Sequence, residues 1–320
     1  MVAHAQPLLL RVFVAGASGA IGRPLVRALL AAGHQVTGMT RREERVAELR
    51  AAGATAVVCD ALDPEALRDE VVLAAPEVVV HELTALPEKL DPREPGVYDA
   101  TNRVRREGTA NLVAAAHAAG ATRMVAQSVA FLYEPEGDWV KAEEAPPMRS
   151  AAGAFATALE GIMDLERQVL GAEGIDGLVL RYGFFYGPGT SYRRDGYQAQ
   201  EVRRRRFPVV GRGNGMFSFV HVDDAAAATV AAVEGGSPGV YNVVDDEPAR
   251  LRDWLPVFAD AVGAPRPWRI PTFIARLAAG KAVATMATQL RGASNAKAKA
   301  ELGWAPAHPT WRDGFRDALG

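Results

Sequence analysis

Short apolar runs alternate with segments of helical periodicity along the first half of the chain. The apolar runs predict strands at residues 10–15, 34–40, 55–59, 77–81, 123–128 and 177–183. Helical patterns lie between them, among others at residues 21–33, 42–53, 101–120 and 149–173. Strands separated by helices are typical of a parallel sheet, and right-handed crossovers place the helices on both faces. The pattern therefore predicts an α/β fold with a doubly wound parallel sheet.

The pattern changes after Tyr186. Residues 187–215 are polar and rich in turn-forming residues, and residues 217–236 read as a strand, a turn and a helix. We therefore predict a nucleotide-binding domain at residues 1–182 and a smaller, mostly helical substrate-binding part at residues 183–320. Residues 216–245 are expected to be able to pack back against the first domain.

Composition narrows the class of protein. The chain has 320 residues, of which 49% are hydrophobic and 23% charged, and its net charge is −2. A slightly acidic chain argues against a general nucleic-acid binder, which would carry a basic face. The single cysteine, Cys59, excludes an intrachain disulfide framework, and no apolar run reaches the roughly 18 residues of a membrane helix. We expect a cytoplasmic protein that acts on a small molecule and has no nucleic-acid or membrane partner.

Three glycines between the first strand and the first helix indicate a dinucleotide site. Gly16, Gly19 and Gly22 form G-x-x-G-x-x-G in the segment VAGASGAIG. Such glycines allow a tight turn, a close approach of backbone to a pyrophosphate, and packing of the helix on the sheet, and the helix N-terminus favours phosphate. The residues predicted to contact the cofactor here are Gly16, Ser18, Gly19, Ala20, Ile21 and Gly22.

The end of the second predicted strand distinguishes between dinucleotides. An NAD site usually has an acidic residue there to hold the ribose 2′-hydroxyl, but this strand ends in VTGMTRREE. Arg41 and Arg42 offer fork-shaped, charge-assisted hydrogen bonds to a 2′-phosphate. The alternative is that both are solvated residues in the first turn of a surface helix. We predict NADP(H) in preference to NAD(H).

Several longer segments together resemble one known family. VAGASGAIG, CDALD, VVVHELTA, TNRVRREGTANLVAAA, LRYGFFYGPG and FSFVHVDDAA are similar to the motifs of extended or atypical short-chain dehydrogenases/reductases of the NAD-dependent epimerase/dehydratase type, whose helix motif reads TNVxGTxNLLxAA. The resemblance implies a Rossmann-type fold, an NAD(P)-dependent oxidoreductase, and a homodimer through the helices at 97–119 and 149–173. The further cofactor contacts that we predict on this basis are Asp60, Ala61, Leu83, Thr84, Asn102, Gln127, Tyr182 and Phe185.

The chain departs from this family in its catalytic residues. Redox members use a tyrosine whose pKa is lowered by a lysine four residues later, but no tyrosine here has that partner. When Glu166 is aligned with the family's helix glutamate, Ala158 and Ile162 occupy the tyrosine and lysine positions. If Phe155 is taken as the tyrosine instead, Leu159 falls on the lysine. The family's acid–base pair is missing in either alignment.

Three hydroxyl groups remain as candidate proton donors. RMVAQSVAFLYEP resembles the family's RFVYVSSAAVYG, which aligns Ser128 with the first serine of that pair and Val129 with the usual catalytic one. Ser128 ends a central strand, where ligands of open α/β sheets bind, and therefore ranks first. Tyr133 follows on a loop, and Tyr182 replaces a proline that the family has close to the nicotinamide. Strand-end capping and aromatic packing are the structural alternatives for these residues.

Two polar clusters also need an interpretation. His221, Asp223 and Asp224 resemble a metal site, but packing at a strand end and an aspartate N-cap of the following helix explain them better, so we predict no metal. Residues 203–206 are four consecutive arginines. In sugar-nucleotide relatives this region meets a substrate diphosphate, whereas the alternative is a solvated basic loop.

The function that follows is an NADP(H)-dependent oxidoreductase with an altered proton relay. Hydride transfer is the chemistry of the cofactor, and loss of a general acid lowers the rate without abolishing it. A small activated carbonyl, enone or imine needs little help from an acid. The alternatives are an NADP(H)-binding sensor or interaction protein without turnover, and a non-redox epimerase, dehydratase or isomerase.

Overall fold

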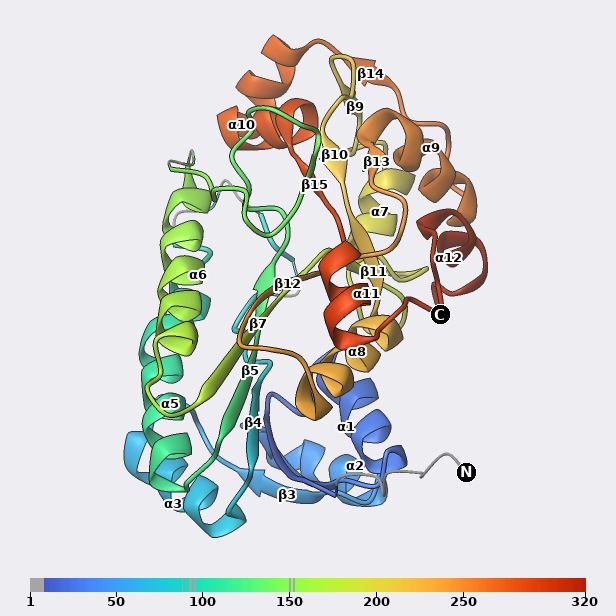
Figure 1. The fold of residues 1–320 in the computed structure, drawn as a ribbon. Helices are drawn as coiled ribbons and strands as arrows, with labels where there is room; N and C mark the ends of the chain where they lie inside the picture. Colours follow the sequence, from blue (N-terminus) through green and yellow to red (C-terminus); the bar gives the residue numbers. More distant parts are fainter. Residues whose placement is uncertain (1–8, 88, 92–93, 95, 150, 152) are drawn as a thin grey trace, which may run out of the picture.

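A seven-stranded parallel sheet forms the centre of the molecule. The structure is a computed structural model that describes residues 9–320 except 88, 92–93, 95, 150 and 152. The strands follow the order β12-β7-β5-β4-β1-β2-β3 (Figure 1). Their bounds are β1 (Arg11–Ala15), β2 (Gln35–Thr40), β3 (Thr55–Val58), β4 (Val78–His81), β5 (Arg123–Val129), β7 (Asp176–Tyr182) and β12 (Gly239–Val243). The predicted doubly wound parallel sheet is confirmed.

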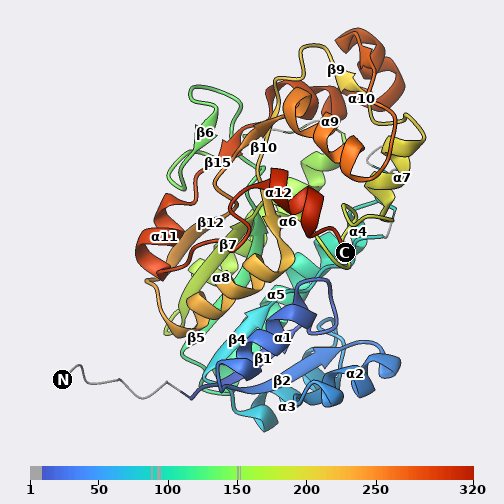
Figure 2. The ribbon, with the colours of Figure 1, turned by 90° about the vertical axis from the view of Figure 1, so that its right-hand side faces the viewer.

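Helices cover both faces of this sheet (Figures 1 and 2). On one face lie α1 (Gly22–Ala31), α2 (Val46–Ala51) and α8 (Val222–Glu234), whose buried side chains share a core with Val12, Val14 and Val80. On the other lie α3 (Pro64–Ala74), α5 (Thr109–Ala118) and α6 (Ala154–Leu170), which pack on Phe13 and Val79. Successive residues of a strand point to opposite faces, so each strand contributes to both cores.

The helix predicted at residues 101–120 is a composite. It consists of α4 (Asp99–Arg103), a π-helical segment η2 (Val104–Gly108) and α5. A π-helical turn is wider than an α-helical one and often marks a functional site. Periodicity did not reveal the change, because the apolar positions of the segment remain compatible with one helix.

The C-terminal part forms a second core of mainly aromatic side chains. Trp254, Phe258, Phe219 and Phe315 are fully buried, and their rings meet at angles of about 60° to 80°. Part of the chain beyond residue 182 returns to the first domain, since β12 is an edge strand of the main sheet and α8 contacts α1. The predicted boundary at residue 182 therefore lies before the last strand of the sheet. No helix among the described residues is long and apolar enough to cross a membrane.

The remaining elements are short apart from the two helices α9 and α10. They are η1 (Glu43–Arg45), β6 (Val140–Lys141), β8 (Phe184–Tyr186), α7 (Tyr197–Arg203), β9 (Val209–Val210), β10 (Met216–Phe217), β11 (Phe219–His221), β13 (Ala249–Arg250), α9 (Leu251–Ala261), β14 (Arg269–Ile270), α10 (Thr272–Gln289), β15 (Gly292–Ala293), α11 (Ala296–Leu302) and α12 (Trp311–Asp317).

A buried ion pair joins the sheet to α6. The Arg181 guanidinium of β7 donates to both Glu166 carboxylate oxygens, at 2.9 and 2.6 Å, and both side chains are at most 5% exposed. Ser128 of β5 donates to the same carboxylate at 2.5 Å. Arg181 also donates to the Tyr133 hydroxyl, which in turn donates to Asn242 of β12 at 2.6 Å. One network therefore fixes three adjacent strands and a helix.

On the opposite face, the Glu82 carboxyl group is buried without a cation. Glu82 follows β4, and its Oε1 lies 3.2 Å from the Tyr182 hydroxyl, which is 2.6 Å from the Thr229 hydroxyl. Its other oxygen, Oε2, has no hydrogen-bond partner among the described residues. Burial disfavours the charged form and raises the pKa of Glu82 to about 8, although the Tyr182 hydroxyl opposes the shift. Glu82 is therefore a neutral acid at pH 7.

Glu82 makes the stability of the protein depend on pH. In the unfolded chain this carboxyl group loses its proton near pH 4.5, whereas the folded protein retains it to about pH 8. The contribution of Glu82 to the free energy of unfolding is thus fully present below pH 4.5. It is lost as the pH rises toward 8, by about 1.4 kcal/mol per pH unit. We expect Glu82→Gln to be the more stable protein at pH 8 by a few kcal/mol, measured by urea unfolding between pH 5 and pH 8.

The control for this experiment is Glu173→Gln, since Glu173 is exposed. Asp245, which is also buried and has a raised pKa, contributes equally to all three proteins and cancels from the comparison. If the free energy of unfolding depends on pH in the same way for the wild type and for Glu82→Gln, Glu82 is not a neutral buried acid.

Candidate functional site

The first glycine of the loop fits closely against the end of β4. Gly16 has a φ of +95°, and a Cβ atom there would lie 2.6 Å from the Glu82 carbonyl oxygen. Gly22 is equally constrained, because a Cβ atom would collide with the Gly16 carbonyl oxygen. Gly19 differs, since it is exposed, has no positive φ, and a Cβ atom would lie 3.2 Å from Gly16 O. The first and third glycines are needed by the fold, whereas Gly19 is the glycine open to a ligand.

This loop has the form of a phosphate cradle. It connects β1 to the N-terminus of α1, whose N-cap residue Ile21 provides no side-chain hydrogen bond. Free backbone N–H groups and the positive end of a helix favour an anion. The residues present therefore fit the pyrophosphate of a dinucleotide. Ser18, Ala20 and Ile21 lie in this loop, as the sequence predicted.

The end of β2 carries no carboxylate. Thr40 is buried, and its hydroxyl lies 2.9 Å from the Ser18 hydroxyl and accepts a hydrogen bond from Arg42 N. The Arg41 and Arg42 side chains are exposed, and neither forms an ion pair within the described part of the chain. Thr40 thus ties the glycine loop to β2, and two cations remain available beside it.

The other predicted cofactor contacts also lie beyond the carboxyl ends of strands. Asp60 and Ala61 follow β3, and Leu83 and Thr84 follow β4. Thr84 and Asp60 are exposed, Leu83 is half-buried, and the Ala61 carbonyl accepts a hydrogen bond from Asn111 at 2.9 Å. These residues lie at one edge of the sheet, the edge that carries the glycine loop.

Gln127 and Phe185 complete the predicted set. The Nε2 atom of Gln127 is buried without a hydrogen-bond partner in the described structure. The strand register pairs His81 with Ala126, so Gln127 stands beside Glu82, whose Oε2 is also unpartnered. Phe185 is half-buried and its ring contacts that of Tyr182. None of these contacts tests cofactor binding, which stays a prediction for each residue.

All three candidate proton donors have buried and engaged hydroxyl groups. Ser128, Tyr133 and Tyr182 are 6%, 2% and 0% exposed. Ser128 donates to Glu166, and Tyr133 donates to Asn242. Tyr182 is bonded to Glu82 and Thr229, and burial raises its pKa well above its usual value. Their role as donors is not tested by these contacts, but no hydroxyl of the three is free for a ligand in this arrangement.

The alternation of β5 explains the position of Ser128. Met124 and Ala126 belong to the core under α3, α5 and α6, and Ser128 is the next residue on that face. Its side chain therefore points toward Glu166 of α6.

Both residue pairs that align with the family's tyrosine and lysine, Ala158 with Ile162 and Phe155 with Leu159, are apolar. Ala158 and Ile162 of α6 are 1% and 3% exposed. Asn102 of α4 lies against this helix and donates to the Thr157 carbonyl at 2.9 Å. Close packing is possible because residue 161 is glycine, where a Cβ atom would lie 2.6 Å from Asn102 Oδ1. Asn102 thus positions α6.

Sequence reasoning missed a cluster of phenyl rings. Phe131 follows β5, Phe155 lies in the first turn of α6, and Phe184 begins β8. The Phe131 and Phe184 rings stack at 4.5 Å, and the Phe155 ring centroid is 6.3 Å from that of Phe131. All three are half-buried. Each is separately readable as core, and only the fold brings them together at the carboxyl end of β5 and β7.

Glu82 and Arg105 were also missed. A glutamate directly after the apolar run VVVH was a usable signal for Glu82, because side chains at that point of a parallel strand are buried or lie near ligands. Arg105 is 8% exposed in η2. It stands in the polar run RVRRE, and nothing in the sequence distinguishes it from the exposed arginines beside it.

The polar cluster at His221 is structural. The expected aspartate N-cap is wrong, since His221 is the N-cap of α8 and its imidazole accepts a hydrogen bond from Asp223 N at 3.3 Å. Asp224 instead accepts from the backbone of Ala307 and His308, because α8 packs against the C-terminal segment. No group of metal-binding residues is found within the described ranges.

The arginine run at residues 203–206 is partly structural as well. Arg203 donates to the Val262 and Arg194 carbonyls, and Arg204 pairs with Glu201. Arg205 and Arg206 are exposed, and a role of the run toward a substrate diphosphate stays a prediction.

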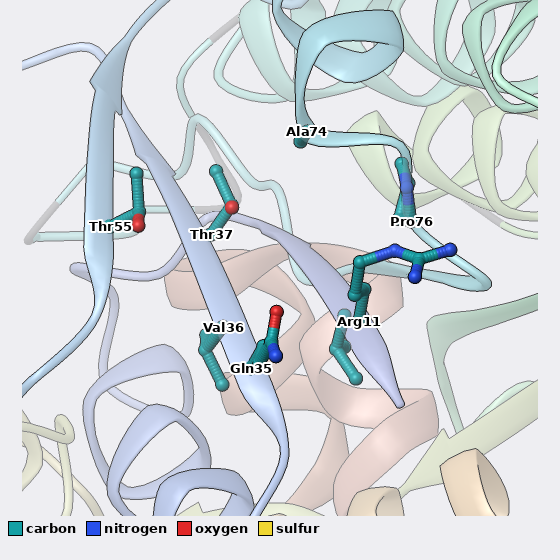
Figure 3. Close-up of a pocket in the computed structure, with 8 residues that line it drawn as sticks. Arg11, Gln35, Val36, Thr37, Thr55, Ala74 and Pro76 are labelled. Atoms are coloured by element: carbon teal, nitrogen blue, oxygen red, sulfur yellow. The ribbon is translucent and has the colours of Figure 1, made fainter. Parts of the chain in front are cut away.

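One small cavity lies away from this edge (Figure 3). It has a volume of about 80 Å³ and is lined by residues that include Arg11, Gln35 and Pro76. Arg11 and Gln35 are the first residues of β1 and β2. The cavity therefore opens at the amino ends of the strands, opposite the glycine loop, and is not the candidate site.

Sequence comparison finds reductases among the relatives. The chain is 47% identical to a 3-diazoavenalumate denitrifying reductase of Streptomyces sp, over 96% of this chain and 99% of the relative. It is 28% identical to a 2-alkyl-3-oxoalkanoate reductase of Stenotrophomonas maltophilia, over 80% of this chain and 77% of the relative. These relatives support the expectation of an NAD(P)-dependent oxidoreductase.

Structural comparison supports the same fold. A UDP-glucose 4-epimerase of Thermotoga maritima with UDP-glucose superposes with a TM-score of 0.75 at 21% identity, covering 96% of this chain and 97% of that one. A human epimerase family protein with NADPH superposes with a TM-score of 0.73 at 20% identity, covering 97% and 99%. A family model matches residues 12–243, and the chain belongs to the NAD-dependent epimerase/dehydratase family.

Proposed function

We propose that this protein is an NADP(H)-dependent reductase of an activated organic acid, with a diazo-substituted aromatic acid as the first candidate substrate. One observation carries the proposal: apolar residues stand in place of the family's acid–base pair in either alignment, and the hydroxyls of Ser128, Tyr133 and Tyr182 are buried and hydrogen-bonded. Such a site suits a substrate that accepts a hydride without receiving a proton from the enzyme.

A diazonium group meets this requirement. The nicotinamide cofactor, when bound, supplies a hydride. Replacement of a diazonium group by hydrogen at an aromatic carbon consumes one hydride and releases N2, so no alkoxide forms and no proton is needed. Reduction of a ketone leaves an alkoxide, for which a positioned acid contributes about 10²–10⁴ in rate. We therefore rank a diazo acid above the wider class of carbonyl, enone and imine substrates.

The ring cluster suits an aromatic cation. The half-buried rings of Phe131, Phe155 and Phe184 offer apolar contact to an aromatic ring. The π-face of an aromatic side chain also attracts a positive charge, such as that of a diazonium group. The relative at 47% identity carries a diazo compound in its name, which agrees with this assignment.

The residues that would hold the cofactor are on this chain. The loop at Gly16, Gly19 and Gly22 would bind the pyrophosphate, and Arg41 and Arg42 would bind a 2′-phosphate. Gln127, with its unpartnered Nε2, would line the nicotinamide end. The buried hydroxyl groups of Ser128 and Tyr133 would hold the shape of this end by fixing β5 against α6 and β12.

A ketone is the second candidate substrate, because the relative from Stenotrophomonas maltophilia is named for an oxoalkanoate. A cofactor-binding sensor and a non-redox isomerase remain the alternatives if no turnover is found. A homodimer through the helices at 97–119 and 149–173 is also part of the proposal.

Gly19→Val tests the loop. A branched side chain at this exposed position would block the approach of the pyrophosphate, and we expect the affinity for NADPH to fall by about 10² or more. Because Gly19 has ordinary φ and moderate contacts, the melting temperature should change little. Calorimetric titration with NADPH and thermal unfolding measure the two effects.

Gly16→Ala is the matched variant. The positive φ and the close Glu82 carbonyl predict that it loses stability as well as affinity, by about 1–3 kcal/mol. A folded Gly19→Val protein that binds NADPH normally would refute the assignment of the loop.

Arg41→Ala tests the cofactor preference. Wild-type protein should bind NADPH more tightly than NADH, and the variant should lose about 1.5–3 kcal/mol of NADPH affinity while NADH affinity stays constant. Arg27→Ala, an exposed arginine of α1, is the control. Equal wild-type affinities for the two dinucleotides would show that the arginines do not read a 2′-phosphate.

Isotope labelling tests the reaction. With 4-carboxybenzenediazonium and NADPH deuterated at the transferred position, we expect benzoate with one cofactor-derived deuterium and none from solvent D2O. Single-turnover rates of Ser128→Ala, Tyr133→Phe and Tyr182→Phe should fall by less than about tenfold through altered packing, since loss of a general acid would cost about 10²–10⁴.

Control reactions without enzyme, and with the Gly19→Val protein, measure the direct reduction of the diazonium substrate by free NADPH, and this rate is subtracted. A folded hydroxyl variant that is slower by 10² or more would identify a proton donor and favour the ketone. Tight NADPH binding without oxidation by any diazo, carbonyl, enone or imine substrate would favour the sensor.

A further inference from the structure

Arg105 is a buried cation in the π-helical segment. It lies in the middle of η2 and is 8% exposed. Its Nη1 atom donates to Asn102 Oδ1 at 3.2 Å and to the Ala158 carbonyl at 3.5 Å. Its Nε and Nη2 atoms make no hydrogen bond to the described residues, and no carboxylate of these residues pairs with it.

The neighbouring arginines are different. Arg103 and Arg106 are exposed and have acidic partners, Glu107 at 2.9 Å and Asp164 at 2.9 Å respectively. Arg181, which is as buried as Arg105, has the Glu166 carboxylate at 2.6 Å. Arg105 therefore departs from the usual rule that buried charges are paired.

The charge of Arg105 is retained. Burial lowers the pKa of Arg105 to about 10, which keeps the guanidinium protonated at neutral pH. The pKa of the buried His81 is lowered to about 4, mainly by burial and also by the charge of Arg105. A buried cation without a counter-ion is unfavourable, and an anion placed against it is correspondingly stabilised.

The position of Arg105 connects it to the candidate site. It contacts Asn102 and also Ala158, which one of the two alignments places at the family's tyrosine. Phe155 of the ring cluster precedes Ala158 by three residues and so lies on the same side of α6. In the family motif TNVxGT the asparagine stands three residues before the glycine. Arg105 stands three residues before Gly108, so it falls on the asparagine position when the two motifs are aligned on this glycine.

We propose that Arg105 binds the carboxylate of an organic acid substrate while the ring cluster holds its apolar body. This inference rests on the proposed function and names the class of substrate. The Nε and Nη2 atoms form the side edge of the guanidinium, which matches the two oxygens of a carboxylate. The cofactor phosphates would have their own partners in the glycine loop and at Arg41, so they would not need Arg105.

Binding of an unreactive acid tests this assignment without turnover. Cinnamate and its neutral methyl ester are titrated into the protein saturated with NADP⁺, for wild type, Arg105→Gln, Arg105→Lys and the control Arg103→Gln. Wild type and Arg103→Gln should bind cinnamate at least tenfold more tightly than the ester. Arg105→Gln should lose this preference with unchanged NADP⁺ affinity, and Arg105→Lys should retain part of it.

Several outcomes would overturn the assignment. Equal wild-type affinities for acid and ester would do so without any variant, as would failure to bind either probe. An Arg105→Gln protein that keeps the acid preference would show that another residue binds the carboxylate, and one that loses NADP⁺ affinity would assign Arg105 to the cofactor. If Arg105→Gln does not fold, Arg105→Lys with an undiminished preference overturns the bidentate contact. Absence of diazo reduction with acid binding intact would refute the proposed function alone.

Discussion

The ion pair between Arg181 and Glu166 fixes the geometry on which the candidate site depends. It joins β7 to α6 in the interior, where charges are tolerated only with close partners and satisfied hydrogen bonds. Ser128 and Tyr133 complete this requirement by bonding to the carboxylate and to the guanidinium. Ser128 and Tyr133, which the sequence suggests as proton donors, are therefore members of a buried hydrogen-bond network.

This network explains how the fold can persist without the family's acid–base pair. Two contacts set the orientation of α6: the ion pair of its residue Glu166 with Arg181, and the hydrogen bond from Asn102 of α4 to the Thr157 carbonyl. Neither contact requires a tyrosine or a lysine at positions 158 and 162. The helix can present small apolar residues there while the strand ends beside it keep their positions. The loss of two polar groups is thus local in its structural effect, although it changes which reactions the site suits.

The architecture was predictable because it depends on local signals. Short apolar runs between helical patterns predicted the main-sheet strands β1, β2, β3, β4, β5 and β7, and the glycine loop indicated the edge where a cofactor is expected to bind. The seventh strand was harder, because β12 lies beyond the predicted boundary and pairs with β7 across about 60 residues of chain.

The side-chain environment was less predictable. Ser128 was correctly placed at a strand end, but its proton acceptor comes from a helix 38 residues away. Arg105 resembles a surface residue in the sequence, whereas the apolar run before Glu82 indicated burial or a nearby ligand. Only the fold shows that neither residue has an oppositely charged partner among the described residues. Pairing of buried groups depends on tertiary contacts, which a single sequence does not contain.

The π-helical segment has a consequence for how helices of this fold can change in length. A π turn holds one residue more than an α turn, so a helix can gain or lose a single residue there while the segments on either side continue undisturbed. In this chain α4 and α5 keep their contacts with α6 and α3 on either side of η2. A one-residue insertion at this point would therefore leave both helices in place and would rotate a different side chain toward the interior. Changes in the register of one helix, and not only substitutions, are a means by which such proteins can acquire a new buried group.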